Sequence, residues 1–135
     1  MITPIEHART KEAVNKYKVE PYVIPADVYG AQNLAGSGGW TWYTGSSSWY
    51  YLAGIQYILG LKIENNIMTI EPCIPKDWEK YEIKFKFGES IYNIKIENKN
   101  GKNTGVEKVI VNGEETENEI KLNKSGKIFN IEIIM

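Results

Sequence analysis

Cysteine and histidine are nearly missing from this chain of 135 residues, and charged residues are missing from one long stretch of it. Cys73 is the single cysteine, so neither an intramolecular disulfide nor a site built from several thiolates can form. We expect Cys73 to be a small buried apolar residue. His7 is the single histidine, which excludes a metal centre with several imidazole ligands. The sequence therefore predicts no resident metal or cofactor.

A strong charge of either sign is also missing, because 16 basic and 17 acidic residues give a formal net charge of −1. This balance gives no electrostatic reason to expect nucleic acid or an anionic membrane as a partner. Residues 1–7 show neither the basic segment nor the apolar run of a secretory signal. The uncharged stretch from Val28 to Leu61 is interrupted by Gly, Ser, Asn and Gln, so it lacks the roughly 20 mostly apolar residues of a membrane-spanning helix. We therefore expect a cytoplasmic protein.

Two helices are predicted in the first part of the chain. Thr10 can cap a short helix that ends near Tyr17. A longer helix is predicted over Ser47–Leu59, with one of the serines 46–48 as its N-cap and Gly60 just beyond its end. Its apolar residues recur at helical spacing: Trp49, Leu52, Ile55 and Leu59. The chain supplies little surface to cover this stripe, which indicates a missing neighbour.

The second part of the chain alternates apolar and charged residues with the period of β-strands. Strands are predicted over 67–70, 81–87, 91–96, 106–111, 120–122 and 128–134. Asn112-Gly113 is a strong hairpin signal, and the nearly apolar last strand should be central or covered. Several antiparallel strands with regular turns favour a β-sandwich. The predicted fold class is therefore α+β.

A candidate anion site lies inside the ring-rich run from Gly38 to Tyr51. Thr44, Gly45 and Ser46 stand just before the predicted helix, where unpaired backbone N–H groups and the helix dipole favour an anion. This step could bind phosphate without a basic residue, or it could be no more than a helix cap.

The aromatic residues before this step are candidates for sugar binding. Trp40, Trp42 and Tyr43 could stack on a sugar ring, and an indole N–H could donate to a hydroxyl. The other interpretation is a packed aromatic cluster. Strand-like alternation would place Trp40 and Trp42 on one side and Thr41 and Tyr43 on the other, so at least one pair would then be core.

Acidic residues show no pair with diagnostic spacing for cleavage of a glycoside. Glu20, Asp27, Glu71 and Asp77 are candidates by residue type alone. His7 could act as an acid or base or bind phosphate, but a surface or capping role is favoured near the chain start. We therefore predict no catalytic residue in this chain.

Five blocks in a fixed order carry a resemblance to a known family. They are Lys18–Val23, Ala26–Tyr29, Gly38–Ser46, Ile58–Leu61 and Pro72–Trp78. Together they closely resemble the end of glycoside hydrolase family 94, which contains cellobiose and chitobiose phosphorylases and the phosphorylase-like region of cyclic β-1,2-glucan synthases. The start of the chain looks most like the glucan synthases. Beyond Asn98 the sequence is generic β-structure.

The resemblance implies a fold and a reaction. The family has a large α/α-barrel followed by a small β-sandwich, so residues 1–62 would end the barrel and residues 63–135 would form the sandwich. Its members cleave β-linked gluco-oligosaccharides with inorganic phosphate as co-substrate and invert the anomeric centre, giving α-glucose 1-phosphate. The family's phosphate-contacting Thr-Gly pair maps onto Thr44 and Gly45. Trp40, Trp42 and Tyr43 would line the sugar site.

The resemblance also implies that this chain lacks the catalytic acid. The family's catalytic aspartic acid, and the arginine and histidine that share phosphate binding, lie upstream of everything present, and neither His7 nor Asp27 takes their place. We therefore expect a terminal fragment or separately encoded part of a phosphorylase, inactive alone, whose partner is the missing barrel portion or a second subunit. The alternative is a non-catalytic module that binds carbohydrate or packs against another subunit.

Overall fold

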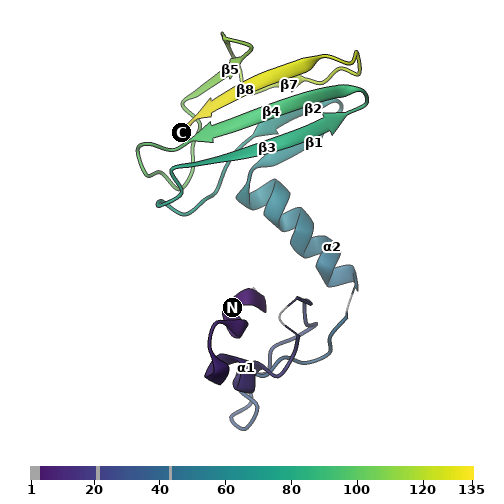
Figure 1. The fold of residues 1–135 in the computed structure, drawn as a ribbon, viewed down its shortest axis with the longest axis vertical. Coiled ribbons are helices and arrows are strands. Elements are labelled where there is room, and N and C mark those ends of the chain that lie inside the picture. The colour runs from purple at the N-terminus through teal and green to yellow at the C-terminus, as the bar shows by residue number, and fades with distance from the viewer. Residues whose placement is uncertain (1–3, 21, 43) are drawn as a thin grey trace. The chain divides into compact units, whose positions relative to one another are not determined.

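The structure is a computed structural model that describes residues 4–20, 22–42 and 44–135. The chain forms two compact units, Met1–Leu52 and Ala53–Met135 (Figure 1). The boundary expected after residue 62 remains a prediction.

The first unit begins with two short helices. The 3₁₀-helix η1 covers Pro4–Ala8, and the α-helix α1 covers Lys11–Tyr17. The predicted cap of α1 is confirmed, because the Thr10 side chain accepts a hydrogen bond from the Ala13 N–H at 3.1 Å. Lys18 ends the helix in the left-handed conformation, with φ of 62°.

Tyr17 is the buried anchor of the first unit, with only 2% of its surface exposed. Its ring stacks on His7 at 4.0 Å between centroids, and its carbonyl accepts from the Gly38 N–H at 2.8 Å. Gly38 is required at this approach, since a Cβ there would lie 2.6 Å from a methyl of Val19. The Tyr17 hydroxyl is buried and finds no hydrogen-bond partner among the described residues, and burial raises its pKa.

The longer predicted helix is present, but it begins earlier than expected. The α-helix α2 covers Thr44–Leu52, and the π-helical segment η2 covers Ala53–Ile58. Serines 46–48 therefore lie inside α2, and the prediction that one of them caps it is wrong. The prediction for Gly60 is confirmed, because it follows the helical segment with a φ of 79°.

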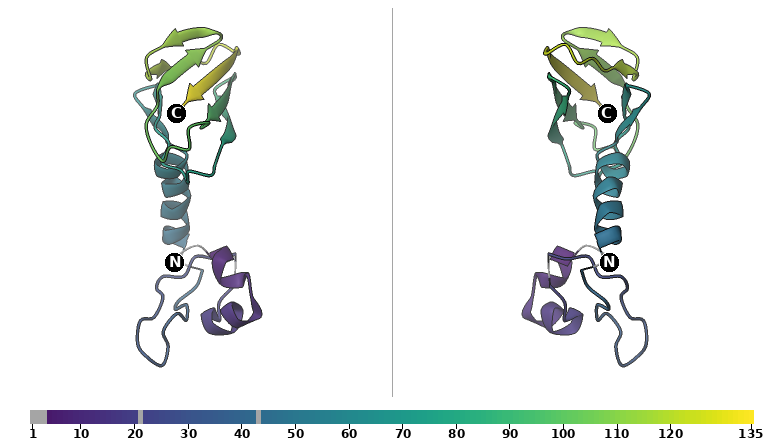
Figure 2. Two further views of the ribbon diagram at one scale, coloured as in Figure 1. Left: turned by 90° about the vertical axis from the view of Figure 1, so that its left-hand side faces the viewer. Right: turned by 90° about the vertical axis from the view of Figure 1, so that its right-hand side faces the viewer.

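The second unit is a sandwich of two sheets (Figures 1 and 2). The three-stranded sheet has the order β1 (Leu61–Glu64), β2 (Ile67–Ile70), β7 (Ile120–Lys121). The five-stranded sheet has the order β3 (Lys80–Phe87), β4 (Ser90–Glu97), β8 (Ile128–Ile134), β5 (Lys108–Val111), β6 (Glu114–Thr116). The predicted strands are confirmed with small changes at their ends, and β1 and β6 were not predicted.

One pairing differs from the expected antiparallel sandwich. Strands β4 and β8 run parallel, with Ile94 opposite Ile131. The chain between them forms β5, β6 and β7, so β8 enters the sheet from the same end as β4. The central place predicted for β8 is confirmed, because it lies between β4 and β5. The Asn112-Gly113 hairpin is confirmed as the turn between β5 and β6, with φ of 51° and 89°.

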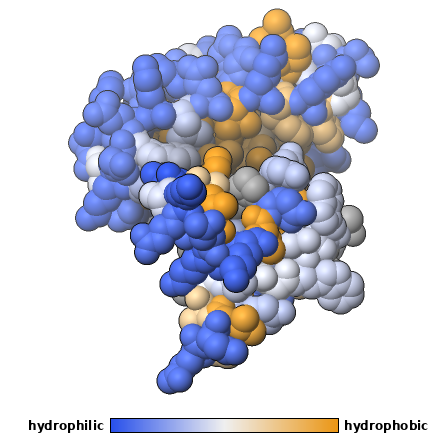
Figure 3. Space-filling view, turned by 60° about the horizontal axis from the view of Figure 1, so that its bottom comes forward, coloured by the Kyte–Doolittle hydropathy of each residue, from blue (hydrophilic) through white to orange (hydrophobic). Residues whose placement is uncertain are grey.

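The core of the second unit lies between the two sheets. Eight of its members from the strands are at most 3% exposed: Met68, Ile70, Tyr92, Ile94, Ile96, Val109, Ile131 and Ile133. Removing each such side chain from water stabilises the fold by about 1.5–3 kcal/mol. The Tyr92 hydroxyl is also satisfied, since it accepts from the Asn123 N–H at 2.8 Å and donates to the Asn123 carbonyl at 3.3 Å. On the face shown in Figure 3, hydrophilic side chains dominate and leave apolar surface between them.

Cys73 is exposed, so the prediction that it is a buried apolar residue is wrong. Its neighbours Pro72 and Ile74 are both buried in the extended connection after β2. Because side chains alternate in extended backbone, the cysteine between them faces outward. The Cys73 N–H donates a hydrogen bond to the Ile58 carbonyl at 2.9 Å.

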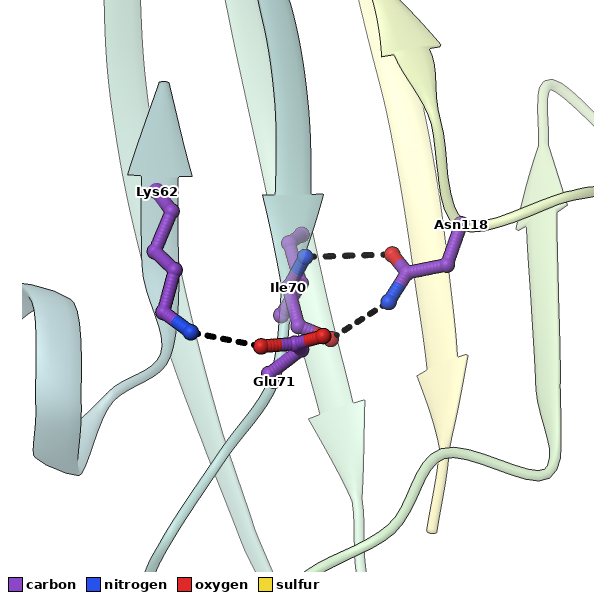
Figure 4. A network of polar contacts seen from close by, with 4 residues as sticks. All are labelled: Lys62, Ile70, Glu71 and Asn118. Atoms are coloured by element: carbon purple, nitrogen blue, oxygen red, sulfur yellow. Dashed lines mark hydrogen bonds and ion pairs between the residues drawn. The ribbon is translucent and has the colours of Figure 1, made fainter. Parts of the chain in front are cut away.

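The side chain of Asn118 closes the end of β2 (Figure 4). Its Oδ1 accepts from the Ile70 N–H at 3.1 Å, and its Nδ2 donates to the Ile70 carbonyl at 2.9 Å. Strand β7 pairs with Ile67 and Met68. The asparagine therefore supplies at Ile70 the two bonds that a longer β7 would make.

The Asn118→Ala variant should lower the free energy of unfolding by about 1–3 kcal/mol, because it leaves the buried N–H and carbonyl of Ile70 without partners. Urea unfolding followed by circular dichroism measures the change. Asn93→Ala is the matched control, since it removes an exposed hydrogen bond to Asn130 and should change stability by less than about 0.5 kcal/mol. Equal urea midpoints for the two variants would contradict a stabilising role for the two hydrogen bonds between Asn118 and Ile70.

Candidate phosphate and sugar site

The segment between α1 and α2 folds back on itself and presents the ring-rich run. The Ala26 N–H donates to the Trp40 carbonyl at 2.7 Å, and the Gly39 N–H donates to the Asp27 carbonyl at 2.9 Å. An isolated bridge joins Val28 to the same strip of backbone. The residues just before α2 are thus held by backbone bonds to the block of residues 26–28.

Gly39 lies close to the side chain of Asp27. A Cβ at Gly39 would lie 1.9 Å from the Asp27 Oδ1, so a substitution there would require the exposed Asp27 carboxylate to move. Asp27 is therefore packed against the backbone of the ring-rich run while remaining exposed to solvent.

The two tryptophans of the run are exposed, so Trp40 and Trp42 are not a core pair; whether the other pair is core stays a prediction. Their exposed fractions are 73% and 65%. The backbone at Trp42 has a φ of 62°, which breaks the strand-like alternation on which that interpretation depended. Both rings remain accessible to a ligand. Tyr43 lies outside the described residues.

Trp42 is held by two partners from the preceding loop. Its Nε1–H donates to the Glu20 Oε1 at 3.3 Å, and its ring meets Tyr22 edge-on at 6.2 Å between centroids. Neither Tyr22 nor the hydrogen bond to Glu20 was predicted from the sequence, where Glu20 is a candidate only by its acidic type. No periodic pattern could have found them, because they lie about twenty positions from Trp42 in the chain.

Thr44 and Gly45 are the first two residues of α2, so they lie inside the first turn and not before it as expected. Backbone N–H groups in this turn have no acceptor within the helix, and the helix dipole adds positive potential there. The first turn contains no acidic side chain that would repel an anion, and Gly45 is exposed. This arrangement can bind phosphate oxygens through the backbone.

The other sequence-predicted acids are engaged elsewhere. Glu71 pairs with the Lys62 Nζ at 2.5 Å, and this hydrogen bond raises the pKa of Lys62 (Figure 4). Asp77 lies in a turn closed by the Trp78 N–H and the Pro75 carbonyl at 3.1 Å. Glu20 and Asp27 belong to the first unit, and Glu71 and Asp77 belong to the second.

The described ranges show neither a metal-binding cluster nor a membrane span. Residues 4–20, 22–42 and 44–135 contain no group of three or more His, Cys, Asp or Glu side chains that could hold a metal ion. None of the described helices combines the length and the apolar character needed to cross a bilayer.

Comparison with known proteins gives one family and several relatives. Residues 1–60 match the sequence model of the glycosyl hydrolase 94 superfamily, catalytic domain. A cyclic β-(1,2)-glucan synthase of Rhizobium meliloti (strain 1021) is 41% identical over 96 residues, which is 71% of this chain and 3% of that protein. An N,N′-diacetylchitobiose phosphorylase of Vibrio furnissii is 34% identical over 96 residues, or 70% of this chain and 12% of that protein. A solabiose phosphorylase of Paenibacillus borealis is 34% identical over 97 residues, which is 71% of this chain and 13% of that protein.

These similarities cover the candidate site and continue past it. The match over residues 1–60 includes the ring-rich run and all of α2. The similarities of 96 and 97 residues are longer than that match, so they also include part of the second unit. The chain spans only a small share, 3–13%, of the length of these relatives. The chain belongs to glycoside hydrolase family 94 and corresponds to a C-terminal region of its members.

Proposed function

We propose that this chain is the terminal part of an inverting, phosphate-dependent β-glucoside phosphorylase or of a cyclic β-1,2-glucan synthase-like protein. Within that protein it contributes part of the phosphate subsite. One observation carries this proposal: the residues that match the family contain two exposed tryptophans shortly before the start of α2, where backbone N–H groups have no acceptor within the helix.

Each part of this arrangement has its own role in the proposal. The backbone N–H groups at Thr44 and Gly45 bind phosphate oxygens, and the absence of a side chain at Gly45 allows a close approach. Trp40, Trp42 and Tyr43 line the neighbouring sugar position, where an indole ring can cover the apolar C–H face of a pyranose. Phosphate is bound here as a co-substrate, and no resident cofactor is required.

The reaction needs groups that this chain does not provide. An oxygen of phosphate attacks the anomeric carbon from the face opposite the leaving group, and the new C–O bond forms as the glycosidic C–O bond breaks. A carboxylic acid outside this chain protonates the leaving oxygen. The products are α-glucose 1-phosphate and the shortened saccharide. The chain has a binding role in this scheme and no catalytic residue.

Two features of the first unit support a larger protein around it. The Tyr17 hydroxyl is buried with no partner among the described residues, and a buried donor left unpaired costs about 1–3 kcal/mol. Trp49 and Leu52, half of the predicted apolar stripe, are 75% and 40% exposed. We propose that an α/α-barrel covers them, with residues 1–62 forming its end, either in the same polypeptide or as a separate subunit in the cytoplasm.

The isolated chain tests the incomplete nature of the site. Incubated with phosphate and β-linked gluco-oligosaccharides, the purified 135-residue chain should release no α-glucose 1-phosphate above background. Enzymatic detection of the sugar phosphate provides the measurement. Robust release would overturn the proposal that the catalytic acid lies outside this chain.

A second function is favoured by the exposure of Trp40 and Trp42. A non-catalytic module could use these rings to bind carbohydrate without phosphate, or to pack against another subunit. Calorimetry with gluco-oligosaccharides discriminates the two functions. Saturable binding that is independent of phosphate and is lost in Trp40→Ala would favour the module.

A further inference from the structure

A groove in the second unit shares no lining residue with the ring-rich run. It has a volume of about 1190 Å³ and lies between the end of β2, the loop before β5 and the segment after β6. Gln56 and Tyr57 of η2 also line it. Sites for single small molecules usually measure about 300–1,000 Å³. The groove is therefore large enough for an extended ligand of several linked units.

The charged groups of the groove largely neutralise one another. Lys62 pairs with Glu71 at 2.5 Å, and Lys108 pairs with Glu115 at 2.7 Å. Glu107 is paired with Lys102. Both lysines that line the groove and three of its four glutamates are thus in ion pairs. An anion such as phosphate would find no unpaired lysine here, and a cationic peptide would find most carboxylates already neutralised.

The polar groups are fixed in place and retain capacity for hydrogen bonds. A carboxylate has about four acceptor positions, so one bond to a lysine leaves positions for the hydroxyls of a ligand. Asn118 is held by its two bonds to Ile70, and Glu71 by its bond to Lys62 (Figure 4). Gln56, Thr104 and Thr116 add side chains that both donate and accept. Hydroxyl-rich neutral ligands suit such a lining.

An exposed aromatic ring completes the groove. Tyr57 lines the groove and is 65% exposed. Val106 and Pro72 add apolar lining. A ring face next to fixed hydrogen-bonding groups matches a pyranose, whose C–H face is apolar and whose edge carries hydroxyls.

We propose that this groove binds a neutral saccharide chain, at a site separate from the phosphate subsite. In an enzyme acting on polymeric glucan, such a site would hold the substrate at a second point and raise its local concentration. The inference does not depend on the proposed phosphorylase function, because it uses only residues of the second unit.

Heteronuclear NMR on the complete chain tests the groove. A linear β-1,2-linked glucotetraose and cellotetraose are titrated without phosphate. Amide shifts should be confined to Gln56, Tyr57, residues 104–109 and residues 115–118. Inorganic phosphate alone should not shift these amides. Shifts confined to the first unit, or none at millimolar saccharide, would overturn the proposal.

Variants at exposed tyrosines separate the groove from the ring-rich run. Tyr57→Ala should weaken saccharide binding about tenfold through loss of the ring face, and Tyr57→Phe should retain most of the affinity. Tyr22→Ala probes the ring-rich run instead, because Tyr22 contacts Trp42 there. Tyr29→Ala is the matched control, because Tyr29 is 40% exposed and does not line the groove, so its binding should equal that of the unsubstituted chain. Loss of binding in Tyr22→Ala with full binding in Tyr57→Ala would place the saccharide at the ring-rich run and refute the groove.

Discussion

Replacing Gly60 with alanine should destabilise the second unit by about 2–4 kcal/mol. Gly60 has a φ of 79°, which side-chain-bearing residues rarely adopt. A Cβ there would also lie 2.2 Å from the Glu71 carbonyl carbon and 2.4 Å from the Pro72 nitrogen. These contacts are backbone atoms, so no rotation of a side chain can relieve them. The Glu71 N–H donates to the Gly60 carbonyl at 2.9 Å, so relief by backbone movement would break this bond.

Gly113→Ala is the control for Gly60→Ala. Gly113 has a similar φ of 89°, but a Cβ there would meet nothing within 4 Å. Gly113→Ala should lower the free energy of unfolding by only about 1–2 kcal/mol, which is the cost of placing a residue with a Cβ in the left-handed conformation. Urea unfolding of both variants isolates the steric contribution at Gly60. Equal losses of stability would show that the close approach of Gly60 to Glu71 is not present in solution.

Gly45→Ala should weaken phosphate binding about tenfold in an active enzyme that carries this region. The added methyl group lies at the start of α2, where phosphate oxygens would approach the backbone N–H groups. Hydrogen bonds to a charged group contribute about 1.5–3 kcal/mol, so partial loss of one such bond gives a change of this size. Alanine favours helix over glycine by about 0.8–1.0 kcal/mol, so weaker binding cannot be attributed to a less stable helix.

A graft provides the active enzyme for this measurement. The region of the Vibrio furnissii N,N′-diacetylchitobiose phosphorylase that matches this chain is replaced by the chain's own residues, at 34% identity. Gly54→Ala in the same graft is the matched control, because Gly54 lies in η2 and a Cβ there meets nothing within 4 Å. It should leave the phosphate KM unchanged.

The sandwich could be predicted from the sequence because β3 and most of β4 alternate apolar residues with charged or polar ones. Tyr92, Ile94 and Ile96 recur every second residue and are all buried. The parallel pairing of β4 with β8 could not be predicted, since periodicity states which face is buried but not which strand lies alongside. The start of α2 was placed too late because serine is typical of caps, and the sequence gives no sign that the helix continues through it.

The candidate site was predicted only in part. The position of Thr44 and Gly45 near a helix start followed from local sequence, but the exposure of Trp40 and Trp42 did not. It depends on the left-handed backbone at Trp42, which is unusual for a tryptophan. The groove beside Tyr57 had no local signal, because segments from residue 56 to residue 118 line it. Cys73 faces outward because the neighbours on both sides of it are buried.

The phosphate KM of the graft, compared with that of its Gly45→Ala variant, tests the central claim most directly. Release of sugar 1-phosphate is measured at varied phosphate and then at varied disaccharide. We predict that the graft is active and that Gly45→Ala raises the phosphate KM about tenfold while the disaccharide KM stays unchanged. An unchanged phosphate KM in Gly45→Ala, or an equal rise in Gly54→Ala, would contradict a phosphate subsite at the start of α2.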